Sequence, residues 1–235
     1  MRPNLRRLSR FYGIFLLFGT SPAWADALYY DVTLNSSALA AVPDNYSLFF
    51  QLTNGDGIND TNNTVTLSNF AFGAGGAAIP PAQTFGGASG DLNGGASLND
   101  STFFFNAILE GFQPGSNLSF LLGLTTNVGA GPAPDLFAMS VLDGNLSEIP
   151  TLDPSGANTL LTIAIGSPLG IQAFATDPTT PTSTGNYIDM GAPVLTPVVP
   201  GASVPEPSSF LLLGTALAGS ISLRHRREKT RRSRT

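Results

Sequence analysis

Short stretches of alternating apolar and polar residues recur along most of this chain, and they restrict its fold more than any other feature. Residues 28–35 and 46–53 alternate in this way, and a period of two is typical of strands that bury one face. Similar apolar runs follow at 64–72, 102–112, 118–124, 137–141, 161–165 and 171–175. Turn-forming residues separate them, and no long helical stripe occurs. The pattern predicts an all-β fold, an antiparallel jelly-roll-like β-sandwich over residues 26–175.

Local patterns refine this prediction. Within the run 64–72 the apolar phase shifts near Ser68 and Asn69, which predicts a β-bulge. The run 102–112 is apolar on both faces, as in a central strand. The Gly- and Ala-rich segment 73–98 is expected to form a long surface loop.

Residues 176–203 are rich in Pro, Thr, Gly and Ser. Proline favours extended backbone without internal hydrogen bonds, so the segment is predicted to be a linker. The apolar pairs at 194–195 and 198–199 leave open the alternative of an edge strand. The linker would hold the sandwich away from the membrane.

Charge is distributed very unevenly along the chain. All eleven Lys and Arg residues lie among the first ten residues or after Leu223, so residues 26–223 contain no Lys, Arg, His or Cys. The same segment holds every acidic residue except Glu228. It therefore cannot build a Ser-His-Asp triad, a cysteine nucleophile, a typical zinc site or a Walker-type phosphate loop. A polyanion of this kind should not bind nucleic acid.

The first 25 residues have the form of a secretory signal peptide. Four arginines precede the apolar run 11–18, and Ala23 and Ala25 supply the small residues that a signal peptidase accepts. An eight-residue apolar core is too short to span a bilayer as a lasting helix. We expect cleavage before Asp26 and export of the remaining chain through the inner membrane.

The C-terminal end has three consecutive parts. Val204, Pro205, Glu206 and Pro207 form a rigid polar motif, residues 208–223 form an uncharged apolar run, and residues 224–235 are strongly basic. Sixteen residues of helix are about 24 Å long, which is short for a bilayer core of about 30 Å. The run predicts a single transmembrane helix, and the basic tail is expected to stay in the cytoplasm.

This order of parts resembles the PEP-CTERM sorting signal of Gram-negative surface proteins. The resemblance implies recognition by an exosortase, removal of the helix and tail, and export linked to exopolysaccharide. The protein would then reside at the cell surface or in the extracellular matrix. The body also resembles a group of uncharacterised PEP-CTERM proteins, in residues 29–34, 62–70 and 148–150.

One loop is a candidate metal site. Residues 54–63 concentrate oxygen-bearing side chains between two expected strands, and calcium binds six to eight such oxygens. The candidate ligands are Asp56, Asn59, Asp60 and Asn62. The loop lacks the closing Glu of an EF-hand, so a polar turn without metal is the favoured interpretation. No other cofactor is expected.

Three functions fit these observations. The first is a non-enzymatic surface or matrix protein associated with exopolysaccharide. The second is a carbohydrate-binding module, calcium-dependent or not, that uses tyrosines for stacking, since Trp24 is lost with the signal; the candidates are Tyr29, Tyr30, Tyr46 and Tyr187. The third is a glycoside hydrolase, which needs two carboxylates facing one cleft. Glu110 and Glu148 are the candidates, and Glu110 is expected to face outward at a strand end.

Overall fold

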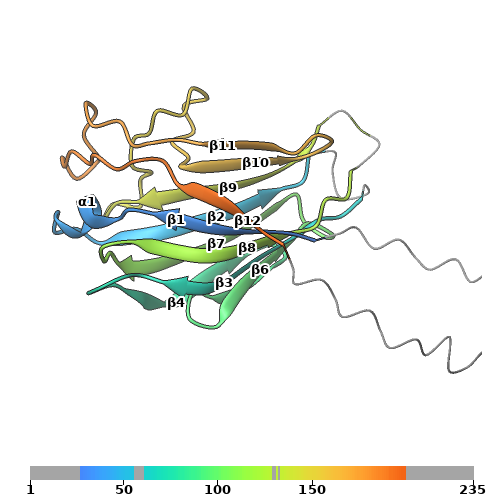
Figure 1. The fold of residues 1–235 in the computed structure, drawn as a ribbon, viewed down its shortest axis with the longest axis horizontal. Helices are drawn as coiled ribbons and strands as arrows, with labels where there is room; N and C mark the ends of the chain where they lie inside the picture. The colour runs from blue at the N-terminus through green and yellow to red at the C-terminus, as the bar shows by residue number, and fades with distance from the viewer. Residues whose placement is uncertain (1–26, 56–60, 129–130, 132, 200–235) are drawn as a thin grey trace, which may run out of the picture.

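Antiparallel strands account for almost all regular structure in the computed structural model, which describes residues 27–55, 61–128, 131 and 133–199 (Figure 1). One short helix, α1 (Ser37–Ala40), accompanies them. The strands are β1 (Leu28–Leu34), β2 (Tyr46–Thr53), β3 (Thr64–Ala71), β4 (Ala77–Phe85), β5 (Ala88–Asp91), β6 (Gly95–Asn99), β7 (Phe105–Gln113), β8 (Leu118–Leu124), β9 (Asp135–Leu142), β10 (Leu161–Ile165), β11 (Gly170–Ala173) and β12 (Val194–Val198).

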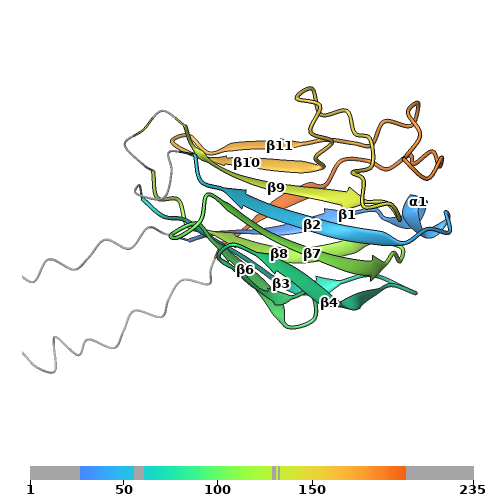
Figure 2. The same ribbon diagram turned by 180° about the vertical axis from the view of Figure 1, so that it is seen from behind.

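The strands form two six-stranded sheets that pack face to face (Figures 1 and 2). The β1 sheet has the order β12-β1-β8-β3-β6-β5, and the β2 sheet has the order β11-β10-β9-β2-β7-β4. Every pairing is antiparallel. The prediction of an all-β fold with antiparallel sheets is confirmed, and the jelly-roll connectivity stays a prediction.

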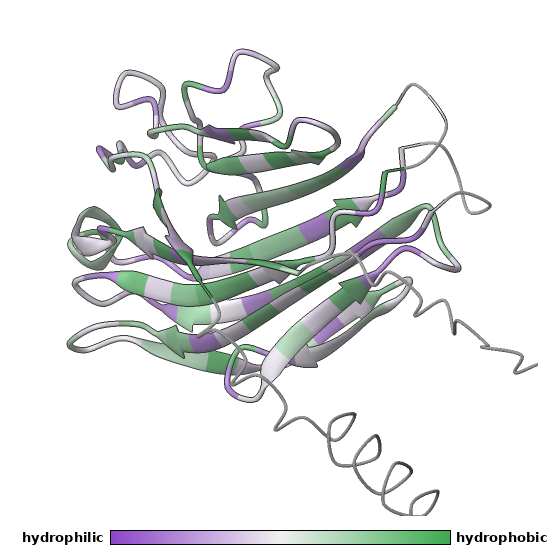
Figure 3. Cartoon of the chain, turned by 45° about the vertical axis from the view of Figure 1, so that its right-hand side comes forward, coloured by the Kyte–Doolittle hydropathy of each residue, from purple (hydrophilic) through white to green (hydrophobic). Residues whose placement is uncertain are grey.

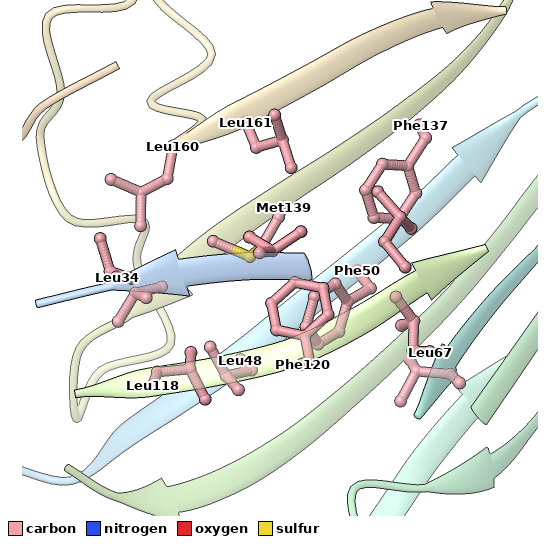
Figure 4. Packing of buried hydrophobic residues seen from close by; sticks show 14 of the residues in the cluster. Leu34, Leu48, Phe50, Leu67, Leu118, Phe120, Phe137, Met139, Leu160 and Leu161 are labelled. Carbon is pink, nitrogen blue, oxygen red and sulfur yellow. The ribbon is translucent and has the colours of Figure 1, made fainter. Parts of the chain in front are cut away.

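The core lies between the sheets and follows the alternation of the sequence. Successive side chains of a strand point to opposite faces, so every second residue of β2 is buried. Phe50 is at the centre, with its ring centroid 5.5 Å from that of Phe120 on β8 and 6.3 Å from that of Phe137 on β9 (Figure 4). Aromatic pairs at these separations add to the energy gained from burial.

Two local predictions are confirmed. The pairing of β3 with β8 changes register between Ser68 and Ala71, and Asn69 has a φ of 57°. This irregularity turns Phe70 toward Phe50, with ring centroids 6.0 Å apart. Strand β7 lies between β2 and β4, as expected for a run that is apolar on both faces.

The predicted surface loop at 73–98 is wrong, because β4, β5 and β6 occupy most of it. Gly and Ala side chains are too small to produce a visible apolar alternation, so the sequence pattern hid these strands. Strand β4 gains its hydrogen bonds from β7, a partner distant in sequence. Gly86 has a φ of 65°, which allows the tight turn between β4 and β5.

The structure also extends the folded domain beyond its predicted boundary at residue 175. In the segment 176–203, predicted to be a linker, β12 pairs with β1, and the side chains of Ile188 and Met190 are buried. The hydroxyl of Thr176 donates a 2.7 Å hydrogen bond to the carbonyl of Ile188. Proline lacks an N–H group but is tolerated in an edge strand, which is where β12 places Pro197.

Several predictions fall outside the described residues. They are the signal peptide at 1–25, the motif at 204–207, the membrane helix at 208–223 and the basic tail at 224–235. Within residues 27–199, wherever placement is described, no helix has the length and hydropathy needed to cross a membrane.

Candidate functional site

A buried polar cluster lies at the end of the sandwich where β2 stops and β3 begins. Asn63 stands immediately before β3, and its backbone N–H donates a 2.7 Å hydrogen bond to Oδ1 of Asp100. Its side-chain Nδ2 donates to Oδ2 of Asp135, also at 2.7 Å. Asn63, Asp100 and Asp135 are all buried. One asparagine therefore joins two buried carboxylates that lie 37 and 72 positions away in sequence.

Further hydrogen bonds complete this cluster. Oδ1 of Asp135 accepts one from the backbone N–H of Gly55 at 2.8 Å. Oδ1 of Asn63 accepts bonds from the hydroxyl of Thr125 at 3.0 Å and the backbone N–H of Asn127 at 2.9 Å. Residues 26–223 contain no basic side chain, so hydrogen-bond donors, rather than ion pairs, must offset the cost of burying these carboxylates.

Of the four calcium candidates, the structure describes only Asn62. Asp56, Asn59 and Asp60 are outside the described residues, whereas Asn62 is exposed and its backbone carbonyl accepts a 2.7 Å hydrogen bond from Nδ2 of Asn127. Among the residues that the structure describes, no group of three or more His, Cys, Asp or Glu side chains could hold a metal ion. Calcium binding stays a prediction.

Sequence reasoning missed Asp100 and Asp135 as members of this cluster. Each stands at an end of an apolar run, the usual place for a solvated turn residue. Only the pairing of distant strands brings both carboxylates to Asn63, so their spacing in the sequence could not have indicated it.

The expectation that Glu110 faces outward is wrong. Glu110 pairs with Leu48 across β7 and β2 and points into the core, where it is only 1 % exposed. Its Oε2 accepts a 2.7 Å hydrogen bond from the backbone N–H of Leu92. Its Oε1 has no hydrogen-bond partner among the described residues. Burial raises the pKa of this carboxyl, the Leu92 hydrogen bond opposes the rise, and the charge of Asp91 adds to it.

Glu110 does not form a hydrolase site with Glu148. Glu148 is exposed at the rim, where it forms an isolated bridge with Leu142, whereas Glu110 is enclosed between the sheets. A polysaccharide cannot reach a carboxyl that the core covers. The structure therefore gives no geometric support for the paired-carboxylate hypothesis.

The raised pKa of Glu110 predicts a specific pH dependence of stability. The folded chain binds the proton of the Glu110 carboxyl more tightly than the unfolded chain does. The contribution of this carboxyl to folding stability is therefore complete at a pH below the ordinary glutamate pKa. This stabilising contribution is lost as the pH rises through the raised pKa of Glu110 in the folded chain. We expect Glu110→Gln to be about 1–2 kcal/mol more stable than the wild type at pH 7, because it removes a buried charge. The difference should shrink toward pH 4, as measured by thermal unfolding at several pH values.

Glu148→Gln is the matched control, since it changes the same side chain at an exposed position. It should leave the pH profile of the melting temperature unchanged. A constant difference between Glu110→Gln and the wild type from pH 4 to pH 8 would contradict the prediction.

A second polar group lies at the opposite end of the sandwich, around Tyr46. Burial, followed by the charges of Asp44 and Asp143, raises the pKa of the Tyr46 hydroxyl to about 12. Although burial opposes it, hydrogen bonds, first among them one from Ser183, hold the pKa of Asp143 below its ordinary value. The hydroxyl of Thr184 donates a 2.6 Å hydrogen bond to Asp44. These contacts attach the loop after β11 to the loop before β2. They give the carboxylates of Asp44 and Asp143 a structural role.

The tyrosines proposed for sugar stacking do not form one platform. Tyr46 is buried, and Tyr29 and Tyr30 are half-buried on opposite faces of β1. Only Tyr187 is well exposed. A row of stacked sugars needs several exposed rings on one surface, and these four residues do not supply it.

Together, these features define an all-β domain of two antiparallel sheets, followed along the chain by a motif, an apolar run and a basic tail. A family model described as the PEP-CTERM protein-sorting motif matches residues 203–227. The match begins one residue before Val204 and extends into the basic tail. No curated protein and no solved structure matches this chain significantly.

The chain therefore carries a PEP-CTERM sorting motif, which is consistent with a PEP-CTERM sorting-domain protein. The signal implies export, a C-terminal membrane-anchored sorting segment and processing by an exosortase, as the sequence predicts. The motif assigns no activity to the β-sandwich.

Proposed function

We propose that this chain is a non-enzymatic surface or matrix protein that is exported, sorted through its C-terminal signal and retained near exopolysaccharide. The observation that carries the proposal is the sorting motif at 203–227 at the end of a folded β-domain. The composition of that domain supports it, because residues 26–223 lack His, Cys and Lys, three side chains that enzymes often use as bases or nucleophiles.

The path of the chain supports a delivery role. Strand β12 is paired to β1 at the edge of its sheet, and the sorting motif begins only a few residues after Val198. The folded domain therefore ends close to the motif, without the long predicted linker. Removal of the segment after the motif would leave the sandwich intact, since all strands among the described residues end before residue 199.

The intact mass of the exported protein tests this proposal. We expect a chain that begins at Asp26 and ends close to Pro207 and is recovered with the cell surface or matrix fraction. Glu206→Gln removes the acid of the motif and should leave residues 224–235 attached. Glu148→Gln, an exposed glutamate in the folded domain, should be processed normally.

Two results would contradict the proposal. One is a wild-type surface protein that still carries residues 224–235, since the segment would then be a lasting anchor. The other is unaltered surface delivery after deletion of those residues.

The alternative function, a carbohydrate-binding module, has less support from the geometry, because the candidate tyrosines are not gathered on one surface. Specific retention on a glycan array, with or without calcium, would favour it over the matrix role.

A further inference from the structure

Within the part of the chain that the structure describes, no helix covers the outer face of the β2 sheet (Figure 2). Its outward positions alternate with the core residues of the same strands, and many are apolar. We define the open face by Ile79 and Phe85 on β4, Phe49 on β2, Phe105 and Leu109 on β7, and Leu136 on β9. Ile79, Phe85, Phe105 and Leu136 are between 40 % and 50 % exposed. Figure 3 shows that hydrophobic residues, in green, recur along the strands of the domain.

The open face carries no charge. Among the six strands of the β2 sheet, the only acidic residues are Glu110 and Asp135, and both are buried. The β1 sheet differs, because Asp31 is exposed on its outer face. Loops at the ends of the sandwich carry further carboxylates, including Asp143, Glu148 and Asp177. In a domain without basic residues, two copies repel each other wherever their acids meet.

The sheet edges oppose edge-to-edge pairing. Pro80 and Pro81 interrupt edge strand β4, and Pro197 lies in edge strand β12. The other two edge strands, β5 and β11, have only four residues each. Short strands and prolines at edges prevent association through backbone hydrogen bonds. Two copies of the domain would therefore associate through a sheet face rather than through a sheet edge.

The size of the open face is adequate for a specific contact. The open face spans the four adjacent strands β9, β2, β7 and β4, and four strands at about 4.8 Å spacing and about 27 Å long give a projected area of roughly 500 Å². Standard protein interfaces bury about 800 Å² of accessible surface per partner, which is of the same order. Contiguous exposed apolar patches of several hundred Å² are often functional.

We propose that two copies of this chain pair through their open faces, as an isologous dimer of β-sandwiches. The charge-free surface is where two such polyanions can approach without bringing carboxylates together. A two-fold axis would place Phe49 and Leu109, near the middle of the face, close to the same residues of the second copy. This inference is independent of whether the domain associates with exopolysaccharide.

Cysteine substitution tests the pairing in exporting cells, because the natural chain contains no cysteine. We expect the full-length chain with Leu109→Cys or Phe49→Cys to form a disulfide-linked homodimer on a non-reducing gel. Val194→Cys is the matched control. Val194 is an exposed apolar residue on the outer face of the β1 sheet and should give at least tenfold less dimer. Equal cross-linking at all three positions, or none, would overturn the proposal.

A second measurement does not depend on disulfide geometry. The mass of the purified exported protein in solution, measured by light scattering, should correspond to a dimer that is strengthened by added salt, because salt screens the repulsion between acidic surfaces. The double variant Phe85→Asp and Leu136→Asp should weaken the dimer at least tenfold, whereas Val194→Asp should not. A wild-type monomer at all concentrations would overturn the proposal. So would a monomer whose retention on neutral dextran is lost in the double variant, because a glycan would then be the occupant of the face.

Discussion

Replacing Phe50 with alanine is expected to lower the free energy of unfolding by about 3–5 kcal/mol, the usual cost of removing a buried phenylalanine. The Phe50 side chain is fully buried and contacts the rings of Phe70, Phe120 and Phe137. Two of these rings belong to the β1 sheet and one to the β2 sheet. The substitution would leave a cavity between the two sheets, and a close-packed core relaxes only partly to fill it.

Urea denaturation followed by circular dichroism measures this effect. Phe104→Ala is the matched control, because Phe104 is 58 % exposed and its removal should change stability by less than about 1 kcal/mol. A loss of less than 1 kcal/mol for Phe50→Ala would show that the sheets do not pack around this ring.

Replacing Asn63 with alanine is expected to cost about 3 kcal/mol. The side chain makes four hydrogen bonds: it donates to Asp135 and to the carbonyl of Asn127, and it accepts from Thr125 and from the N–H of Asn127. Each bond contributes roughly 1 kcal/mol, and a buried charged group that loses a donor costs more. Asp135 would lose a donor in a domain without any basic residue to replace it.

The neighbouring Asn62 provides the control for the same measurement. Its side chain is exposed and only its backbone carbonyl accepts a bond from Asn127, so Asn62→Ala should be nearly neutral. Asn63→Asp should be at least as destabilising as Asn63→Ala, because it places a third carboxylate beside Asp100 and Asp135. Similar stabilities for the Asn62 and Asn63 variants would show that the hydrogen bonds of Asn63 do not stabilise the buried carboxylates.

Strand prediction succeeded where large side chains alternate and failed where they do not. Residues 46–53 show the period of two, and β2 has those bounds. Strands β4 and β5 contain mainly Ala, Gly, Pro, Ser and Gln, so their sequence contains almost no signal. They form because β7 and β6 supply hydrogen-bond partners, and such non-local pairing overrides local preference.

The prediction for Glu110 failed for a related reason. A charged residue in an apolar run is usually solvated, and the alternation of β7 alone does not show which of its faces meets the second sheet. Both neighbouring strands, β2 and β4, must be placed before the inward side is known. The sequence therefore showed that Glu110 is unusual, but it did not show that its side chain lies in the core.

The sequence by itself determined the routing of this protein and its fold class. Routing rests on the sorting motif at 203–227 and on the signal peptide that the sequence predicts at 1–25, and the fold class depends on local periodicity; neither needs distant contacts. Only the tertiary structure decided which strands pair, which carboxylates are buried and which sheet face is left without charge. Those properties come from contacts between residues far apart in the chain, whose burial and electrostatics exist only once the two sheets have packed.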